Sequence, residues 1–306
     1  MPSSVCVCLL THRRPELLGD CLRSLDLQLG LPQAGITMDV LVIDNDPAGS
    51  ALPIYNQLTA GSTYRCRYLI EPNPGIPQAR NRALDETASY DFVAFIDDDE
   101  IADPHWLANL VHAQRNSSAE IVCGPVLPRF EQVPDWVRRG EFFSPCDMPT
   151  GAVPKSIATN NVLLKRSALK DCRFDARFRY TGGSDTFFFM NLRDSGARAM
   201  WCNEARVSEI VSPSRANTHW LIERAYSSAN RYTRSCQYID PGLRTRVARF
   251  GIALAGIGLG LVKMAIGFWA KERIVKGMVL VARGFGTLHA LHGSSYQYYA
   301  PEKNRD

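Results

Sequence analysis

The sequence predicts an α/β fold built on a doubly wound, mostly parallel sheet, followed by a C-terminal helical appendage that is apolar and basic. Three observations support this prediction. Short apolar runs alternate nearly four times with amphipathic, helix-type segments. Each apolar run ends in polar residues, so one edge of the sheet should collect them. A 21-residue apolar stretch near the C-terminus has basic residues on both sides.

The expected elements follow from the spacing of apolar residues. Continuous short apolar runs are typical of buried parallel strands, and apolar residues three and four apart are typical of helices. The expected strands are 5–10, 38–43, 65–70, 92–96, 121–126 and a run within 159–166. The expected helices are 15–29, 51–59, 77–87, 105–113 and one that begins near 187.

Length and composition suit one large domain or two smaller ones. The chain has 306 residues and 45% hydrophobic content, which is enough for a full core. Its nine cysteines include no C-x-x-C pair, and we expect Cys6 and Cys8 to be small core residues rather than ligands. The N-terminus carries no secretory signal pattern, so we expect a reducing, cytoplasmic location.

The net charge of +4 conceals an asymmetry along the chain. Residues 1–212 hold 21 Lys and Arg against 26 Asp and Glu, whereas residues 213–306 hold 14 against five. An acidic body with a basic, partly apolar tail indicates a soluble catalytic part and an appendage that seeks a surface. We expect that surface to be a membrane, and we expect no nucleic-acid partner.

An acid cluster follows the expected strand 92–96, where Asp97, Asp98, Asp99 and Glu100 are consecutive. Clustered carboxylates raise one another's pKa, so such a group is costly at a strand end unless a cation neutralises it. Hard cations such as Mg²⁺ and Mn²⁺ prefer carboxylate and phosphate oxygens, which points to a metal-bound diphosphate. The alternative is a solvated acidic turn without any ligand.

Polar residues recur at the other strand ends, and their types narrow the chemistry. No G-x-G-x-x-G follows the first strand, which argues against a dinucleotide oxidoreductase, and no G-x-x-x-x-G-K-[ST] is present. A nucleoside diphosphate held by aspartates, a cation and an arginine fits better. The residues at this edge are Thr11, Arg13, Asp44, Asp46, Arg80, Asn81, Asp97 and Asp99.

Two later segments are also expected to be functional. Residues 125–154 hold six prolines, which predicts a long, partly mobile segment flanking a cleft. Gly182 and Gly183 precede Asp185, so a glycine turn should deliver this carboxylate to a helix N-terminus. An ordinary first-turn aspartate explains the same pattern equally well.

With these motifs in place, the chain resembles the family 2 glycosyltransferases, and among them the succinoglycan-type exopolysaccharide glucosyltransferases. The resemblance covers about residues 4–235. It implies a GT-A fold, a UDP-sugar donor, Mg²⁺ or Mn²⁺, and inversion at the anomeric carbon. It rests on VCVCLLTHRRP, VIDNDP, NPGIPQARN, FIDDDE, TNNVLLKRS, TGGSDT and WLIERAY in this order.

Carried over by position, the resemblance implies roles for single residues. Asp97 would bind the ribose, Asp99 would ligate the cation, and Asp185 would be the general base. It also divides the chain into a catalytic domain at 1–240, with a nucleotide-binding half at about 1–125 and an acceptor half at 126–240, and a tail at 241–306. The remaining residues of the donor site would be Thr11, Asp44 and Arg80 on the uridine, with Arg13, Asp46 and Asp98 beside them.

The sequence departs from the family pattern at one position. The family has an acidic residue just before the base, and this chain has Ser184, which puts its acceptor preference or rate in doubt. His219 is a second open case, since it could reach the cation or have a structural role.

The tail completes the functional prediction. Residues 250–270 contain one charge, Lys263, and residues 278–291 form a second apolar stretch. Basic residues on both flanks predict a helical hairpin, within residues 244–291, that associates with the cytoplasmic face of the inner membrane as a peripheral or monotopic protein. A buried helical pair is the alternative. The expected activity is transfer of a hexose, most plausibly glucose, from a UDP-sugar to a polyprenyl-diphosphate-linked oligosaccharide. A catalytically lapsed sugar-nucleotide-binding protein is the alternative function.

Overall fold

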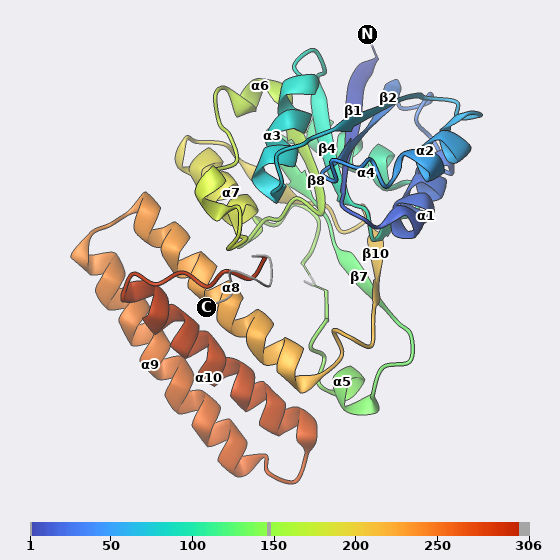
Figure 1. Cartoon of the computed structure of the whole chain (residues 1–306). Helices are drawn as coiled ribbons and strands as arrows, with labels where there is room; N and C mark the ends of the chain where they lie inside the picture. The colour runs from blue at the N-terminus through green and yellow to red at the C-terminus, as the bar shows by residue number, and fades with distance from the viewer. Residues whose placement is uncertain (1, 146–147, 300–306) are drawn as a thin grey trace. The chain divides into compact units, whose positions relative to one another are not determined.

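The computed structural model describes residues 2–145 and 148–299. Strands and helices alternate through the first third of the chain, as the apolar periodicity predicts (Figure 1). These elements are β1 (Ser3–Thr11), α1 (Pro15–Asp26), β2 (Ile36–Asp44), α2 (Leu52–Thr59), β3 (Arg65–Ile70), α3 (Ile76–Glu86), β4 (Phe92–Asp97), β5 (Glu100–Ala102) and α4 (Trp106–Arg115).

The later part of the chain is less regular and ends in three long helices. Its elements are β6 (Ile121–Cys123), β7 (Val126–Phe130), α5 (Asp135–Arg139), β8 (Asn161–Lys165), α6 (Arg166–Leu169), the 3₁₀ turn Ala176–Phe178, α7 (Ser184–Asp194), β9 (Ala199–Trp201), β10 (Val207–Val211), α8 (Thr218–Ile239), α9 (Leu243–Ile266) and α10 (Lys271–Leu291).

A seven-stranded sheet in the order β3-β2-β1-β4-β8-β6-β9 forms the centre of the fold. The neighbours β3, β2, β1 and β4 are parallel to one another, and β6 is parallel to β9. Only β8 is reversed, since it pairs antiparallel with both β4 and β6. The predicted mostly parallel sheet is therefore confirmed.

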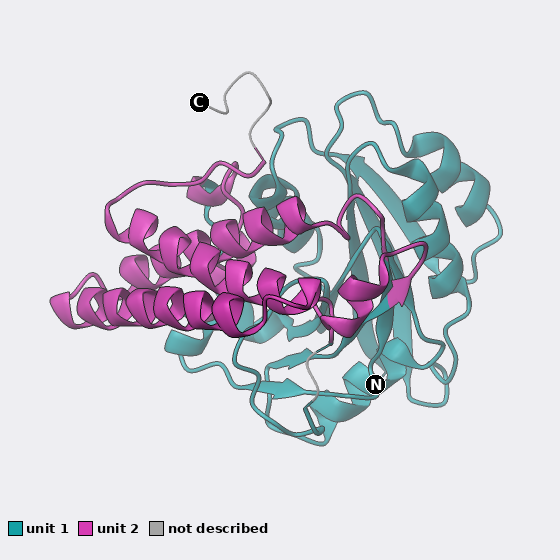
Figure 2. Ribbon diagram, turned by 90° about the horizontal axis from the view of Figure 1, so that it is seen from below, with its two compact units in different colours: residues 1–128, 145–176, 191–210 teal, residues 129–144, 177–190, 211–306 magenta. Residues whose placement is uncertain are grey.

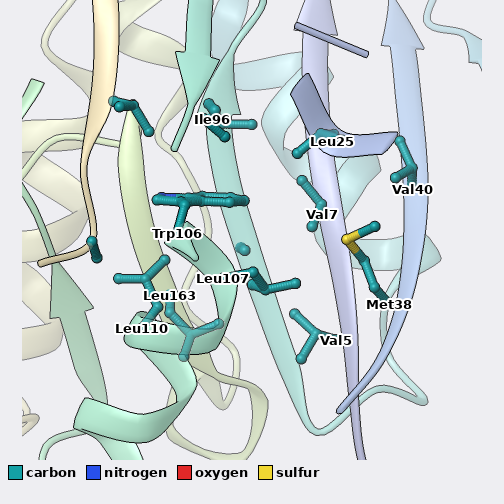
Figure 3. Close-up of a cluster of buried hydrophobic side chains, with 14 of the residues drawn as sticks. Val5, Val7, Leu25, Met38, Val40, Ile96, Trp106, Leu107, Leu110 and Leu163 are labelled. Atoms are coloured by element: carbon teal, nitrogen blue, oxygen red, sulfur yellow. The ribbon is translucent and has the colours of Figure 1, made fainter. Parts of the chain in front are cut away.

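The core lies where β1, β2 and β4 meet the helices that cover them. β1 and β4 are buried along most of their length because β1 pairs on both sides and apolar helix faces cover the sheet. Trp106 and Leu107 from α4 pack there beside Val7 and Ile96 (Figure 3). This rigid base fixes the positions of the strand ends.

The predicted strand 121–126 is wrong in one respect, because it is two strands in two different sheets. The break falls at Gly124 and Pro125. A side chain on Gly124 would lie 2.2 Å from the backbone oxygen of Ala205, and proline cannot donate to a strand ladder. β6 thus stays in the large sheet, and β7 joins a three-stranded sheet in the order β5-β10-β7.

The chain divides into two compact units, coloured separately in Figure 2. Unit 1 comprises residues 1–128, 145–176 and 191–210, and unit 2 comprises residues 129–144, 177–190 and 211–306. The division groups α8 with the two tail helices, whereas the resemblance places a boundary at 240. The functional boundary at 240 stays a prediction.

Unit 2 contains residues 129–144 of the proline-rich segment. This part carries the short helix α5, which begins after Pro134. Trp136 and Val137 of α5 pack with Leu221 of α8 and Val275 of α10. The apolar residues of this part therefore pack against the helices of unit 2, and the predicted mobility of the whole segment stays a prediction.

The helices α9 and α10 are long and apolar enough to cross a membrane by length and composition alone. Most of α9 is exposed, and α10 is more buried than α9. α10 packs against both α8 and α9 (Figure 1). The predicted pair of apolar helices is present, and most of α9 is exposed within unit 2. Association with a membrane and packing on the catalytic domain both stay predictions.

Candidate active site

The candidate site in unit 1 begins at the topological switch point of the sheet. The chain runs outward from β1 through β2 to β3 and then returns to place β4 on the other side of β1. In open α/β sheets, ligands bind beyond the carboxyl ends of the strands at such a point. Thr11 ends β1 and Asp97 ends β4, with Leu10 opposite Asp97 in the parallel register.

The acid cluster is a tight turn between β4 and β5. Glu100 is buried, and its carboxylate accepts hydrogen bonds from the Asp97 N–H at 3.1 Å and the Asn160 amide at 3.1 Å. Burial and the charge of Asp97 raise the pKa of Glu100 well above its usual value. Glu100 therefore holds the turn from inside, and three aspartates remain at the sheet edge.

Two of these aspartates have strongly raised pKa values. Burial raises the pKa of Asp97 to about 7. The charge of Arg80 opposes this rise, and the charges of Asp99, Asp98 and Glu209 add to it. Burial also raises the pKa of Asp98 to about 6, although Thr11 and Arg14 partly offset it. A bound cation would lower both values by stabilising the charged carboxylates.

Arg14 is the residue that the sequence reasoning missed at this edge. Its guanidinium Nη1 lies 3.6 Å from an oxygen of Asp98 and 3.6 Å from an oxygen of Asp99. The hydroxyl of Thr11 donates to the other oxygen of Asp98 at 2.8 Å. The predicted Arg13 turns elsewhere with a positive φ of 56° and pairs with Asp46 at 3.4 Å.

At the end of β2, the side chain of Asp44 is buried and bonds only to other protein groups among the described residues. Its buried carboxylate accepts hydrogen bonds from the Asp46 N–H at 2.9 Å, the Ala51 N–H at 3.0 Å and the Tyr68 hydroxyl at 2.5 Å. These bonds fix the loop between β2 and α2. Desolvation opposes ionisation of Asp46, but the Ala48 N–H and Arg13 outweigh it and lower its pKa.

Asn45, a second residue that the sequence reasoning missed, ties β2 to the turn before α3. Its amide donates to the carbonyls of Glu71 at 2.9 Å and Asn73 at 2.8 Å, and its side-chain oxygen accepts the Gly75 N–H at 2.7 Å. All three partners lie 26 to 30 residues further along the chain. Asn45 therefore positions the start of the helix that carries Arg80.

Arg80 and Asn81 are held by one segment of unit 1. The Arg80 guanidinium lies 5.4 Å from the ring centre of Phe174. The Asn81 side chain donates a hydrogen bond to the backbone oxygen of Phe174 and accepts one from its N–H, each at 2.8 Å. The positive charge of Arg80 lowers the pKa of Asp97, against the larger effect of burial.

Asp185 and His219 belong to unit 2. The predicted glycine turn is present, since Gly182 and Gly183 have φ values of 71° and 88°. Asp185 lies in the first turn of α7, where its carboxylate accepts the Thr186 N–H at 2.8 Å. The half-exposed position of Asp185 suits a group that meets a second substrate. Its pairing with the acid cluster stays a prediction.

His219 lies in the first turn of α8 with a side chain that is 90% exposed. Its Nε2 is 4.0 Å from an oxygen of Glu223. Ser184, where the family has an acidic residue, is buried. A cation-binding role for His219 stays a prediction.

A divalent cation fits the acid cluster in its chemistry. The oxygens of Asp98 and Asp99 already face one positive group, Arg14, and carboxylate oxygens are the ligands that Mg²⁺ and Mn²⁺ prefer. Among residues 2–145 and 148–299, no three His, Cys, Asp or Glu side chains converge closely enough to form a metal site. The site would thus supply few protein ligands and leave the rest to phosphate and water, as is usual for Mg²⁺.

Relatives of this chain are glycan-building proteins. A family model described as glycosyl transferase family 2 matches residues 6–183. The chain is 34% identical over 258 residues to the succinoglycan biosynthesis protein ExoM of Rhizobium meliloti (strain 1021), covering 83% of this chain and 81% of that protein. It is 38% identical over 184 residues to a glucosyl-dolichyl phosphate glucuronosyltransferase of Haloferax volcanii, covering 51% and 54%.

Solved structures with a similar backbone have low sequence identity and inform on the fold alone. The mannosyltransferase PcManGT of Pyrobaculum calidifontis, in complex with GDP-Man and Mn²⁺, has a TM-score of 0.65 at 17% identity and covers 96% of this chain and 89% of that one. TarS 1-349 of S. aureus, in complex with UDP, has a TM-score of 0.54 at 14% identity over 97% and 93%. The predicted GT-A fold is confirmed, and the chain belongs to glycosyl transferase family 2.

Proposed function

We propose that this glycosyltransferase moves a hexose, namely glucose, from a UDP-sugar to a lipid-linked oligosaccharide, with inversion and with the help of Mg²⁺ or Mn²⁺. One observation carries the proposal. The aspartates 97–99 lie beyond β4, beside Thr11 at the end of β1, which is where an α/β sheet binds its ligand. Hard oxygen ligands beside Arg14 and Arg80 suit a metal-bound diphosphate.

The comparisons support the kind of donor. TarS was solved with UDP, and PcManGT was solved with GDP-Man and Mn²⁺. Under this proposal Thr11 and Arg80 contact the nucleotide, Asp97 binds the ribose, and Asp99 ligates the cation. Asp44 shapes the uridine site by holding its loop, because its buried carboxylate already accepts three hydrogen bonds.

The reaction would be a single in-line displacement. A divalent cation, when bound, supplies positive charge to the departing diphosphate, which is where such sites gain much of their rate. The Asp185 carboxylate accepts the proton of the acceptor hydroxyl as that oxygen attacks the anomeric carbon. An α-linked donor then gives a β-linked product.

The tail supports a membrane-bound acceptor. Residues 241–299 hold eight Lys and Arg and one acidic residue, Glu272. Of α9, only Ala253 and Gly260 are buried, so large apolar side chains around this helix are exposed. Exposed apolar surface with a basic excess suits an anionic lipid surface. The names of ExoM and the Haloferax volcanii enzyme agree with a glycan or lipid-linked acceptor.

The alternative, a lapsed enzyme that only binds sugar nucleotides, rests on Ser184. Incubating the protein with a panel of UDP-sugars and Mn²⁺ separates the two, because a working site slowly hydrolyses its donor to UDP. We expect UDP from one donor. No UDP with any donor, in a protein that still binds UDP, would favour the alternative.

The role of Asp185 has its own variant. Asp185→Asn should lower transfer to the acceptor by about 10²- to 10³-fold while the affinity for the UDP-sugar is unchanged, since the base acts on the acceptor. Asp194→Asn, at the exposed end of the same helix, is the matched control and should transfer normally. Mass spectrometry of the products measures transfer.

A further inference from the structure

A groove of about 530 Å³ lies entirely within unit 2. It runs along α10, which packs against both α8 and α9. This volume falls within the range of about 300–1,000 Å³ that is usual for small-molecule sites. The groove is lined by His219, Ile222, Glu223 and Tyr226 of α8, Leu261 and Met264 of α9, Met278, Val281, Ala282 and Phe285 of α10, and Tyr296.

The spacing of the lining residues shows which helix faces form the groove. The four from α8 fall at i, i+3, i+4 and i+7, and the four from α10 follow the same spacing. Each set therefore forms one face of its helix. At a rise of about 1.5 Å per residue, the two faces extend for about 10 Å. The groove is thus lined by matching faces of α8 and α10 over about two helical turns.

The groove has an apolar interior and a polar rim on one side. Side chains from α9 and α10 are all apolar, and two of them are methionines, which adapt to irregular ligands. On α8, the Glu223 carboxylate accepts a hydrogen bond from the Tyr296 hydroxyl at 2.7 Å. The Tyr226 hydroxyl is hydrogen-bonded to the His289 ring. The polar groups of α8 are therefore engaged with protein partners or exposed at the rim.

Glycine contacts keep the helices from shifting to close the groove. A side chain on Gly286 would lie 2.2 Å from the backbone oxygen of Tyr226, so α10 and α8 touch at the backbone. A side chain on Gly260 would lie 2.7 Å from the backbone oxygen of Gly277, so α9 and α10 do the same. Such contacts fix the spacing of packed helices.

The lip of the groove continues into exposed apolar surface. Leu261 and Phe285 line the groove and are 55% and 52% exposed. Phe268 and Trp269, in the turn between α9 and α10, are also exposed, and aromatic residues at such positions are typical of a membrane interface. Exposed apolar side chains therefore occur both at the groove and in the turn between α9 and α10.

We infer that this groove binds the isoprenoid chain of the lipid that carries the acceptor glycan. The inference rests on the proposed function, since it takes the acceptor to be lipid-linked. The interior offers dispersion contacts and no unpaired charge, which suits a hydrocarbon. The exposed Lys263 of α9 and Arg273 of α10, which are not among the lining residues, suit the phosphate group of the same lipid outside the groove. His219 then lies at the polar rim of an acceptor-lipid site.

The test uses a polyprenyl monophosphate with a photoreactive diazirine in its first isoprene units, added to the full-length protein on phosphatidylglycerol vesicles. We expect the label on peptides 219–226 and 278–285. Ala282, at the floor of the groove, is 8% exposed, so Ala282→Trp should fill the groove and lower labelling by about tenfold, the loss of a few buried CH₂ groups. Leu254→Trp, on exposed α9 surface outside the groove, should label normally.

Three outcomes would overturn the inference. The first is equal labelling of Ala282→Trp. The second is equal labelling of the same peptides by a phosphatidylglycerol that carries the diazirine in an acyl chain, which would make the groove a general lipid contact. The third is label only in cross-linked dimers, which would make it an interface between copies of the chain. Circular dichroism checks the fold, and Met278→Trp replaces Ala282→Trp if that variant does not fold. Donor hydrolysis by the unaltered protein is measured in parallel. Its absence would count against glycosyl transfer while lipid labelling would still report on the groove.

Discussion

The two units place charge and apolar surface in opposite ways. Unit 1 contains buried acidic side chains: Asp44, Asp98 and Glu100 lie beneath the surface at the ends of apolar strands. Unit 2 exposes apolar side chains, since residues such as Phe250 and Trp269 are half or more exposed. Buried acids and exposed apolar patches both cost free energy in a protein that only has to fold.

The contrast teaches where to look for function in each unit. In unit 1 the buried carboxylates share hydrogen-bond donors and arginines, which suits a site that takes up a cation and a diphosphate. In unit 2 the exposed surface carries a basic excess, which suits an anionic lipid. Natural proteins keep such unfavourable features mainly at functional sites, so both the buried carboxylates and the exposed apolar side chains indicate function.

The strongest challenge to this interpretation of unit 1 is the loss of one carboxylate. Asp99→Ala should lower transfer by about 10³-fold, because the group that holds the cation on the diphosphate is gone. The melting temperature should stay near that of the unaltered protein. Asp20→Ala, on the exposed side of α1 in the same unit, is the control. Full transfer by Asp99→Ala would remove the acid cluster from the mechanism.

For unit 2, the matching challenge is the loss of basic charge. Lys263 and Arg273 are exposed on either side of the turn between α9 and α10. Changing both to Gln should weaken binding to phosphatidylglycerol vesicles by about 30-fold, since each basic residue near such a surface contributes about 1 kcal/mol. Arg23→Gln in α1 should bind normally. Sedimentation that is equal for all three proteins would contradict membrane association through this hairpin.

A smaller effect sharpens the electrostatics of unit 1. With pKa values of about 7 and about 6, Asp97 and Asp98 hold protons that a cation must displace. Mn²⁺ affinity should therefore rise from pH 6 to pH 8 by up to about tenfold per unit for each displaced proton. Because both values are raised on folding, the cation-free protein should lose stability as the pH rises toward 7. Calorimetry with Mn²⁺ measures the first trend, and a pH-independent affinity would contradict it.

The smallest effect concerns packing within unit 2. Gly286→Ala would bring a methyl group against the backbone of α8, and should lower the free energy of unfolding by about 1–2 kcal/mol. Gly258→Ala, in α9 with open space around it, should raise it by about 0.5–1 kcal/mol through helix propensity. Urea unfolding compares the two. Equal effects would mean that α8 and α10 are not in backbone contact.

The sequence predicted the sheet and the edge at which polar residues gather, because both follow from local patterns. Apolar runs mark parallel strands, and their polar ends meet at one edge whatever the strand order. The direction of β8 has no such signal, since alternation and burial look the same in either direction. The break between β6 and β7 depended on Gly124 approaching Ala205, which lies 81 residues away.

The site was predictable by residue type but not by side-chain direction. Arg13 and Arg14 are adjacent, and only the positive φ of Arg13 turns it toward Asp46 and leaves Arg14 at the acid cluster. Asn45 was missed because its three partners lie far along the chain. The residues that position the site act through tertiary contacts. The pattern of residues adjacent in the sequence carries no information about such contacts.

The position of Arg14 has a consequence for the acid cluster. Its guanidinium supplies Asp98 and Asp99 with a built-in counter-ion. Repulsion at the tip of β4 is therefore partly offset by a residue that lies at the start of α1, 84 positions earlier in the chain than Asp98. Packing of α1 against the sheet thus brings a cation of the protein's own to the acid cluster.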